Sequence, residues 1–346
     1  MTVLIFKIGA IGDVVMMLSA IREIRERWPK ASITWVCGET VAPLLRCVDT
    51  VDSLVTVDEK TLFGGFRGAL ASLWKVRRHL SGKSFDLVLL GHSDSRYRMF
   101  LRFFGVRIKK LMSFGRGLNG RIAPVPGRYH GDEYRRLVTG EEDWRMKEAI
   151  FPPLSLPPIP ESLADVLSPN SGQYVAIAPG GARNYLANDR VRRWPIDHFV
   201  NLAERLLEKN LSVVILGDSG DLWVRPDFSH LETIDLIGKT SLVELLGVLS
   251  RMDAIVSNDS GLMHLAILQN LPIVALFGPT DPSGKIPKNP SEKIRVLWSA
   301  DTLPCCPCYD GKTFAKCDNN LCLKNISVAE VEEAVESLLK LSRIPG

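Results

Sequence analysis

The residues best suited to chemistry stand where an apolar run ends and a helical pattern begins, in SNDSGLMHLAILQNLPIVALFGPTDP from Ser257 to Pro282. Asp259, Ser260 and Gly261 open the predicted helix, and the first amides of a helix can receive a phosphate because they have no partner within it. His264 follows one turn later and is expected on the same rim. A single histidine is more often a structural residue, but this position favours contact with a ligand.

A glycine turn flanked by arginines occurs earlier in the same half, in VAIAPGGARNYLANDRVRRWP. Gly180 and Gly181 follow an apolar run, and Arg192 and Arg193 come shortly afterwards. Exposed backbone amides and planar guanidinium groups both suit the oxygens of a diphosphate. Lys239, in the later segment IGKTS, adds a further cation. Each feature is weak alone, but together they predict a diphosphate site.

The opening segment LIFKIGAIGDVV predicts a strand, a short turn and a helix start. Gly9 and Gly12 bracket the turn, and glycine lets another molecule approach the backbone closely. The spacing is not the G-x-G-x-x-G of a dinucleotide site. Asp13 has two interpretations. It is either an ordinary acid at a helix start, which is the commoner case, or a carboxylate available as a general base.

Apolar, β-branched runs that end in Gly, Asp or Ser recur along the chain and alternate with helical periodicity. Continuous apolar strands of this kind are buried on both faces in parallel sheets covered by helices. The clearest strands are predicted at residues 3–8, 33–37, 87–90, 175–178, 213–216, 254–257 and 273–277. Helices are predicted at residues 14–27, 66–80, 196–209, 242–250, 262–269 and 328–341. This alternation predicts a doubly wound α/β fold.

A proline-dense stretch, FPPLSLPPIPESL at residues 151–163, interrupts the alternation. Proline removes backbone donors and fixes φ, so this stretch is interpreted as a semi-rigid linker. We therefore expect two Rossmann-like domains, 1–165 and 166–346, that face an interdomain cleft, with the C-terminal helix free to pack back on the first domain. Ligands of such sheets bind beyond the carboxyl ends of the strands.

The composition is that of a globular protein. The chain has 346 residues, 46% of them hydrophobic and 24% charged, with 27 Gly and 21 Pro. These values exclude disorder, collagen-like repeats and coiled coil as the main architecture. Lys7 and Asp13 interrupt the apolar N-terminus, no signal-peptide cleavage site is recognisable, and no run reaches the roughly 18 apolar residues that cross a bilayer. We expect a cytoplasmic protein.

Positive charge is concentrated in one part of the first half. The whole chain has 43 basic and 39 acidic residues, too small an excess to indicate a nucleic-acid partner. Between Asp86 and Arg136, however, eleven Lys or Arg residues, Arg96 and Arg98 among them, stand against four acids. Such an excess attracts an anionic ligand or an acidic membrane face. A well-solvated surface is the alternative.

Five of the seven cysteines are crowded into CCPCYDGKTFAKCDNNLC. In a reducing cytoplasm such crowding favours metal binding or redox function over disulfides. The C-x-C and C-x4-C spacings are looser than a paired zinc site, so whether a metal binds stays open. The candidates are Cys305, Cys306, Cys308, Cys317 and Cys322. Cys37 and Cys47 are expected to be ordinary buried thiols.

GAIGD near the N-terminus, RRWP after a Gly-Gly turn, and NDSGxxHLA followed by LPIVALFGPTDP together resemble the bacterial ADP-heptose:lipopolysaccharide heptosyltransferases of glycosyltransferase family 9. The resemblance spans nearly the whole chain. It implies a two-domain GT-B fold, a nucleotide-activated heptose bound mainly by the C-terminal half, and a lipopolysaccharide core acceptor met by the N-terminal half.

By this resemblance Asp13 matches the family's proposed catalytic base, and Arg192 stands where relatives often have lysine near the donor phosphates. Asp259, Ser260, Gly261 and His264 match the donor-binding segment. The implied reaction is an inverting heptosyl transfer. No D-x-D metal-binding pair appears, so protein groups must stabilise the leaving diphosphate: the helix start, Arg192 or Arg193, Lys239, and the turn at Gly180 and Gly181.

The expected partners are ADP-heptose, the lipopolysaccharide core and the anionic cytoplasmic face of the inner membrane, with no required cofactor. Acceptor contacts are assigned to Gly9, Gly12, Arg96 and Arg98. Two alternatives stay open: a nucleotide-sugar epimerase of GT-B-like fold, which needs no acceptor, and a non-enzymatic nucleotide-binding module that uses the cysteines for a metal. A nicotinamide dehydrogenase is disfavoured because the glycine fingerprint is incomplete.

Overall fold

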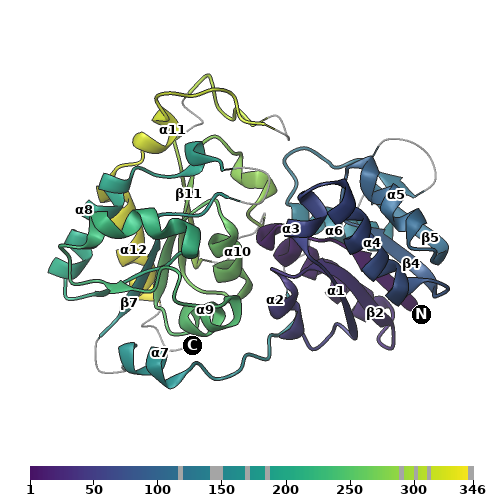
Figure 1. Ribbon diagram of the computed structural model, residues 1–346. Helices are drawn as coiled ribbons and strands as arrows, with labels where there is room; N and C mark the ends of the chain where they lie inside the picture. Colours follow the sequence, from purple (N-terminus) through teal and green to yellow (C-terminus); the bar gives the residue numbers. More distant parts are fainter. Residues whose placement is uncertain are drawn as a thin grey trace. The chain divides into compact units, whose positions relative to one another are not determined.

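The computed structural model describes residues 1–115, 120–140, 151–167, 172–183, 188–287, 292–299, 303–309 and 313–341. Arg116, one of the predicted basic residues, lies outside these ranges. The chain divides into two compact units, whose elements Figure 1 labels. The first unit comprises Met1–Ser155 and Ser283–Asn289, and the second comprises Leu156–Pro282 and Pro290–Gly346. The boundary at Ser155 falls inside the proline-dense stretch.

The first unit is built on a six-stranded parallel sheet in the order β3-β2-β1-β4-β5-β6. Its strands are β1 (Thr2–Phe6), β2 (Ser32–Gly38), β3 (Ser53–Val57), β4 (Ser84–Leu90), β5 (Arg107–Phe114) and β6 (Arg121–Ile122). The central strand β1 pairs with β2 on one side and β4 on the other. Its residues from Val3 to Phe6 are fully buried, because helices cover both faces of the sheet.

The helices of the first unit form two layers. They are α1 (Ile11–Arg27), α2 (Ala42–Arg46), α3 (Glu59–Phe63), α4 (Phe66–Leu80), α5 (Ser95–Phe103) and α6 (His130–Thr139). Leu73 of α4 and Leu101 of α5 share one core with Leu4 and Phe6 of β1. Alternate residues of a strand point to the opposite face, which α1 and α6 cover while packing against each other.

The second unit repeats the plan with the order β12-β11-β10-β7-β8-β9, again all parallel. Its strands are β7 (Tyr174–Ala178), β8 (Ser212–Ile215), β9 (Ile234–Asp235), β10 (Ala254–Asn258), β11 (Ile273–Phe277) and β12 (Ile294–Trp298). Its helices are α7 (Glu161–Val166), α8 (Ile196–Glu208), α9 (Leu242–Leu249), α10 (Gly261–Leu268), α11 (Leu321–Lys324) and α12 (Val328–Leu341). Short 3-10 helices span Arg190–Arg192 and Ser219–Phe228, and a third spans Pro282–Gly284 at the crossing to the first unit.

The C-terminal helix α12 packs within the second unit. Val331, Val335 and Leu338 of α12 join Phe199 and Leu202 of α8 in one core that lies on the sheet. Although we allowed this helix to pack back on the first domain, its contacts are with α8, β10 and β11. Among the described residues, no helix combines the length and apolar character that a bilayer-spanning segment requires.

The predicted α/β architecture is confirmed, and each predicted strand and helix is present within a few residues of its expected bounds. The sequence did not indicate five of the strands, β3, β5, β6, β9 and β12, or six of the helices, α2, α3, α5, α6, α7 and α11. β5 illustrates why: it reads RIKKLMSF and exposes its first four residues. A strand whose first half faces solvent lacks the continuous apolar run that marks a buried one.

Candidate functional site

Both sheets have a topological switch point, where the strand order reverses. In the first unit the reversal lies between β1 and β4, and in the second it lies between β7 and β10. Open α/β sheets bind ligands outside the carboxyl ends of their strands at this position. Gly9, Gly12 and Asp13 follow β1, and the Gly180 turn follows β7. The sequence motifs therefore lie at the two switch points, where sheets of this topology bind ligands.

Asp13 lies in the first turn of α1 and forms an ion pair with Lys7, which follows β1. Lys7 Nζ donates to Asp13 Oδ2 across 2.9 Å. The Lys7 side chain is 6% exposed, whereas that of Asp13 is 33% exposed. Asp13 therefore bonds to a lysine rather than capping helix amides, and its carboxylate remains open to a second molecule.

The ion pair fixes the charge state of both groups. Burial by itself would raise the pKa of the Asp13 carboxyl, but the charges of Lys7 and Lys285 and the hydrogen bond from Lys7 hold it well below its ordinary value. Burial disfavours a charged lysine, yet Asp13 and Tyr134 raise the pKa of Lys7 above its usual range. At neutral pH Asp13 is a carboxylate and Lys7 an ammonium.

Three more side chains surround the pair. His92, which follows β4, accepts a hydrogen bond at Nε2 from the Ile8 amide at 3.0 Å and stacks on Tyr97 with ring centroids 3.7 Å apart. Burial and the positive charge of Lys7 lower the pKa of His92 well below its usual value, so the ring is neutral. Tyr134 of α6 places its ring 5.8 Å from Lys7 Nζ. Sequence reasoning missed Lys7, although a lysine inside an apolar run was a visible signal.

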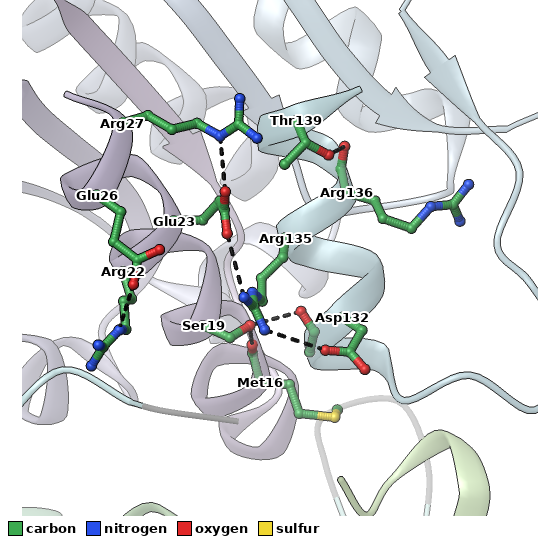
Figure 2. A network of polar contacts seen from close by, with 11 residues as sticks. Met16, Ser19, Arg22, Glu23, Glu26, Arg27, Asp132, Arg135, Arg136 and Thr139 are labelled. Atoms are coloured by element: carbon green, nitrogen blue, oxygen red, sulfur yellow. Dashed lines mark hydrogen bonds and ion pairs between the residues drawn. The ribbon is translucent and has the colours of Figure 1, made fainter. Parts of the chain in front are cut away.

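A buried network holds α6 against α1 (Figure 2). Glu23 of α1 accepts from Arg27 at 2.8 Å and pairs with Arg135 of α6 at 3.4 Å. Arg135 also lies 3.6 Å from Asp132, and Ser19 Oγ donates to the Gly131 carbonyl oxygen at 2.7 Å. Buried charges are costly unless paired, so this network fixes the packing of α6 on α1 and with it Tyr134 beside Lys7.

The residues assigned to acceptor contacts lie around the same switch point. Gly12 is in the first turn of α1, and a Cβ built on Gly9 would have no neighbour within 4 Å, so space is open there. Arg96 and Arg98 are on α5, which begins just after β4. Arg96 pairs with Asp94 at 2.7 Å, and Arg98 donates to Ser113 Oγ. Both arginines are thus already engaged within their own unit.

The glycine turn of the second unit is held by Asn258 at the end of β10. The Asn258 amide group donates to the carbonyl oxygens of Pro179 at 3.0 Å and Gly180 at 3.3 Å, while its side-chain oxygen accepts from the Trp194 amide at 2.9 Å. Gly181 has φ of +77°, and a Cβ there would lie 2.9 Å from Ser260 Cβ. The turn therefore packs directly on the start of α10.

Asp221 explains why the turn needs a second glycine. Its carboxylate accepts from the Gly181 amide at 3.1 Å and from the Asp218 amide at 3.1 Å. A Cβ at Gly180 would lie 2.3 Å from the Asp221 carboxyl carbon. Asn258 and Asp221 were not predicted as site residues, although SNDSG and ILGDSGD contain them. Their role is to shape the edge of the second unit formed by the Gly180–Gly181 turn and the start of α10, which we call the second rim.

The two predicted arginines both touch this rim. Arg192 pairs with Asp259 Oδ2 at 2.9 Å and also donates to the Asp259 carbonyl oxygen. Arg193 donates to the Gly181 carbonyl oxygen at 2.8 Å, and its guanidinium lies 5.2 Å from the Trp223 ring centroid. The structure thus brings Gly180, Gly181, Arg192, Arg193, Asp259 and Ser260 together.

The remaining predicted donor residues lie in different settings. Gly261 begins α10 and Ser260 is its N-cap, whose hydroxyl lies 3.3 Å from that of Ser257. His264 is on the same helix and is buried. Lys239 follows β9 at the edge of the sheet, and its ammonium donates to the Asp235 carbonyl oxygen at 2.8 Å. Lys239 therefore does not lie in the group that Arg192 and Arg193 form with the glycine turn.

The clustered cysteines are all unpaired thiols, as are the buried Cys37 and Cys47, which confirms the expectation for those two. Burial, the neighbouring Cys322 and a hydrogen bond with Cys305 raise the pKa of Cys306 to about 12. Within the described ranges, no three His, Cys, Asp or Glu side chains are arranged to hold a metal ion. Metal binding by Cys305, Cys306, Cys308, Cys317 and Cys322 stays a prediction.

Comparison with known proteins gives consistent matches. A sequence model described as Glycosyltransferase family 9 (heptosyltransferase) matches residues 156–317. The chain is 24% identical to the lipopolysaccharide core heptosyltransferase OpsX of Haemophilus influenzae, over 85% of this chain and 84% of that protein. It is 25% identical to lipopolysaccharide heptosyltransferase 1 of Pseudomonas aeruginosa, over 98% of each. The solved structure of the Escherichia coli ADP-heptose lipopolysaccharide heptosyltransferase II is 21% identical and has a TM-score of 0.74, covering 99% of this chain and 100% of that one.

These matches agree with the two six-stranded sheets described above. They confirm the resemblance drawn from the sequence motifs and the expected GT-B fold of two Rossmann-like domains.

Proposed function

We propose, from the premise that this chain is a glycosyltransferase of the family 9 group, that it transfers a heptosyl residue from ADP-heptose to the inner core of lipopolysaccharide. The transfer is inverting and needs no metal ion. One observation carries the proposal: a partly exposed carboxylate, Asp13, is kept ionised by Lys7 at the switch point of the first sheet.

Asp13 acts as the general base. A sugar hydroxyl is far too weak an acid to lose its proton before attack, but it becomes acidic as its oxygen bonds to the anomeric carbon. Asp13 then accepts that proton while the bond to the diphosphate breaks. A carboxylate with a lowered pKa is a modest base, so it works only when proton transfer accompanies attack. In the reacting complex the hydroxyl oxygen lies about 2.6 to 3.2 Å from the carboxylate.

The rim of the second unit binds the donor. The leaving ADP gains negative charge, and the backbone amides at the start of α10 can stabilise it without reorganising, because Asn258 and Asp221 hold the adjacent Gly180–Gly181 turn in place. Arg192 supplies a guanidinium beside Ser260, and its pairing with Asp259 orients it. Lys239 contacts the donor only at the margin of this site, because its ammonium bonds to the Asp235 carbonyl oxygen.

The first unit binds the acceptor. Space beside Gly9 admits a sugar hydroxyl next to Asp13, and Arg96 and Arg98 attract the anionic groups of the core. This acceptor is an amphiphile made at the cytoplasmic face of the inner membrane, so we also propose that the protein associates peripherally with that face. Lys and Arg residues near an acidic leaflet contribute about 1 kcal/mol each, and salt screens this attraction.

The test is a transfer assay with a panel of nucleotide sugars and a heptose-deficient core acceptor, read by mass spectrometry in the presence of EDTA. The expected product carries one added heptose from ADP-heptose only, and its new linkage has the anomeric configuration opposite to that of the donor by NMR. Conversion of the sugar nucleotide without acceptor would instead indicate an epimerase. Donor binding without any turnover would contradict the proposal outright.

A further inference from the structure

Helix α4 of the first unit, labelled in Figure 1, turns large apolar side chains to solvent. Phe66 is 85% exposed, Leu70 is 40% exposed and Trp74 is 51% exposed. Their spacing of four residues places all three in one row along the helix. Phe63, at the end of α3 and next to this row, is exposed as well. Contiguous exposed apolar side chains usually mark a surface that contacts something.

This row is not the core-facing side of the helix. Leu73, Val76 and Leu80 already bury the inner side of α4 in the core that it shares with the sheet. The row lies on the outer side and adds nothing to that core. Trp74 is nevertheless held in place: its ring meets Phe103 edge-on at 5.9 Å between centroids, and the Arg77 guanidinium lies 5.6 Å from its ring centroid. An exposed tryptophan whose ring is already held in place loses little conformational entropy when it binds a second surface.

The charge on the two helices that flank the row is positive. Helices α4 and α5 together contain seven Lys or Arg residues and no Asp or Glu, whereas α1 and α6, on the other face of the same sheet, carry five of each. Lys75 pairs with Glu39 at 3.3 Å, but Arg67 and Arg78 have no ion-pair partner among the described residues. A cavity of about 350 Å³ between α5 and β5 is lined by two of these seven residues, Arg98 and Arg102, and by Lys109, which pairs with Asp86 at 2.7 Å.

We infer that the outer side of α4 docks on an anionic lipid bilayer, with Phe66, Leu70 and Trp74 entering the interface and the arginines contacting lipid phosphates. Aromatic and leucine side chains beside Lys and Arg are the composition of helices that lie in the plane of a membrane interface. The inference deepens the proposed membrane association by assigning its contact surface. A protein partner or a second copy of this chain would need acidic groups opposite these arginines.

The first experiment is co-sedimentation of the full chain with phosphatidylglycerol vesicles and with phosphatidylcholine vesicles. Wild type is expected to bind phosphatidylglycerol at low salt and to lose binding as salt rises. The double variant Phe66→Ser, Leu70→Ser should bind at least tenfold more weakly at every salt concentration, while Val166→Ser, which removes an exposed apolar side chain from α7, should bind as wild type does. Equal binding by the double variant overturns the inference.

The second experiment reads the depth of Trp74. Lipids brominated in the acyl chain should quench wild-type fluorescence, and the Trp74→Phe variant should lose most of that quenching. Equal quenching in the two proteins would place the contact elsewhere and overturn the assignment. A change in molecular mass by light scattering in the double variant, with vesicle binding intact, would show that the row joins two copies instead.

These outcomes are separate from the proposed reaction. Heptosyl transfer to a delipidated, soluble core acceptor should be unchanged in the double variant, which also shows that it is folded. Transfer that fails already in wild type would contradict the reaction but leave the vesicle result to stand by itself.

Discussion

The two sheets have the same strand order but secure their site residues by different means. At the switch point of the first unit, a nearly buried ammonium and a partly exposed carboxylate hold each other across 2.9 Å. At the switch point of the second unit, Asn258 and Asp221 bind backbone groups of a glycine turn. The first arrangement fixes a charge, and the second fixes the backbone of an uncharged turn that packs on the start of α10.

This difference matches the two tasks of a glycosyl transfer. Proton acceptance requires one side chain in a defined ionisation state, which nearby charges control. Binding a diphosphate requires several donors aimed at one place, which the first amides of a helix packed on a rigid turn provide without protonation. We therefore expect that variants of Lys7 and Asp13 in the first unit change turnover and its pH dependence. Variants of the second rim should instead change stability and donor affinity.

The largest effect is expected from Asp13→Asn. The amide keeps the shape of the side chain but cannot accept the proton, so turnover should fall roughly 1000-fold, within the range that general-base groups contribute. Affinity for ADP-heptose, measured by calorimetry, should change less than about threefold. Asp165→Asn, on the surface of α7, serves as the control and should be fully active. Near-normal turnover of Asp13→Asn would remove this carboxylate from the mechanism.

Asn258→Leu tests the second rim. The change leaves the carbonyl oxygens of Pro179 and Gly180 and the Trp194 amide without their partner in a buried place, which should cost about 2 to 3 kcal/mol in the free energy of unfolding. Urea denaturation measures this loss, and donor affinity should fall with it. Asn201→Ala on the exposed side of α8 is the matched control. A stable variant with normal donor binding would show that Asn258 does not shape the site.

Lys7→Met tests whether the ion pair of the first unit sets the ionisation of Asp13. Methionine fills a similar volume but removes the charge and the hydrogen bond of Lys7, so burial raises the pKa of Asp13 against only the weaker charges of Lys285 and His130. The acid limb of the pH profile of kcat should move to higher pH, and turnover at neutral pH should fall about tenfold, a loss of roughly 1.4 kcal/mol. An acid limb at the wild-type position would mean that Lys7 does not control Asp13.

The smallest effect on turnover is expected at Asp132, in the network of Figure 2 and away from the reacting groups. Burial raises its pKa from 3.8 to about 6, against the opposing charges of Arg135 and Arg128. Between these values the folded protein holds a proton that the unfolded chain has released, so stability falls as pH rises through this window. Asp132→Asn should remove that slope, which the two pKa values set at about 2 to 3 kcal/mol in the free energy of unfolding between pH 4 and pH 7. If the free energy of unfolding changes with pH in the same way in wild type and Asp132→Asn, Asp132 is not the source of the slope.

The sequence predicted the elements that are apolar and continuous. The central strands β1, β7, β10 and β11 were placed within two residues because each is buried on both faces and ends in a turn residue. The strand β5 was not predicted because its first half is charged and exposed. Amphipathic periodicity gave α4 its bounds without error. It did not show that the outer side of this helix carries an apolar row of its own, since exposure depends on the neighbours.

Local periodicity and backbone preference were enough to predict the fold class, the position of each glycine turn and the placement of Asp13 at a helix start. Which groups meet is visible only in the folded chain: Lys7 lies against Asp13 and Tyr134, Asn258 holds the Gly180 turn, and Lys239 lies away from both arginines. Charge pairing and desolvation depend on distance in space, which the turn after β1 sets for Lys7 and Asp13 and which the order of the parallel strands sets for Tyr134 and Asn258.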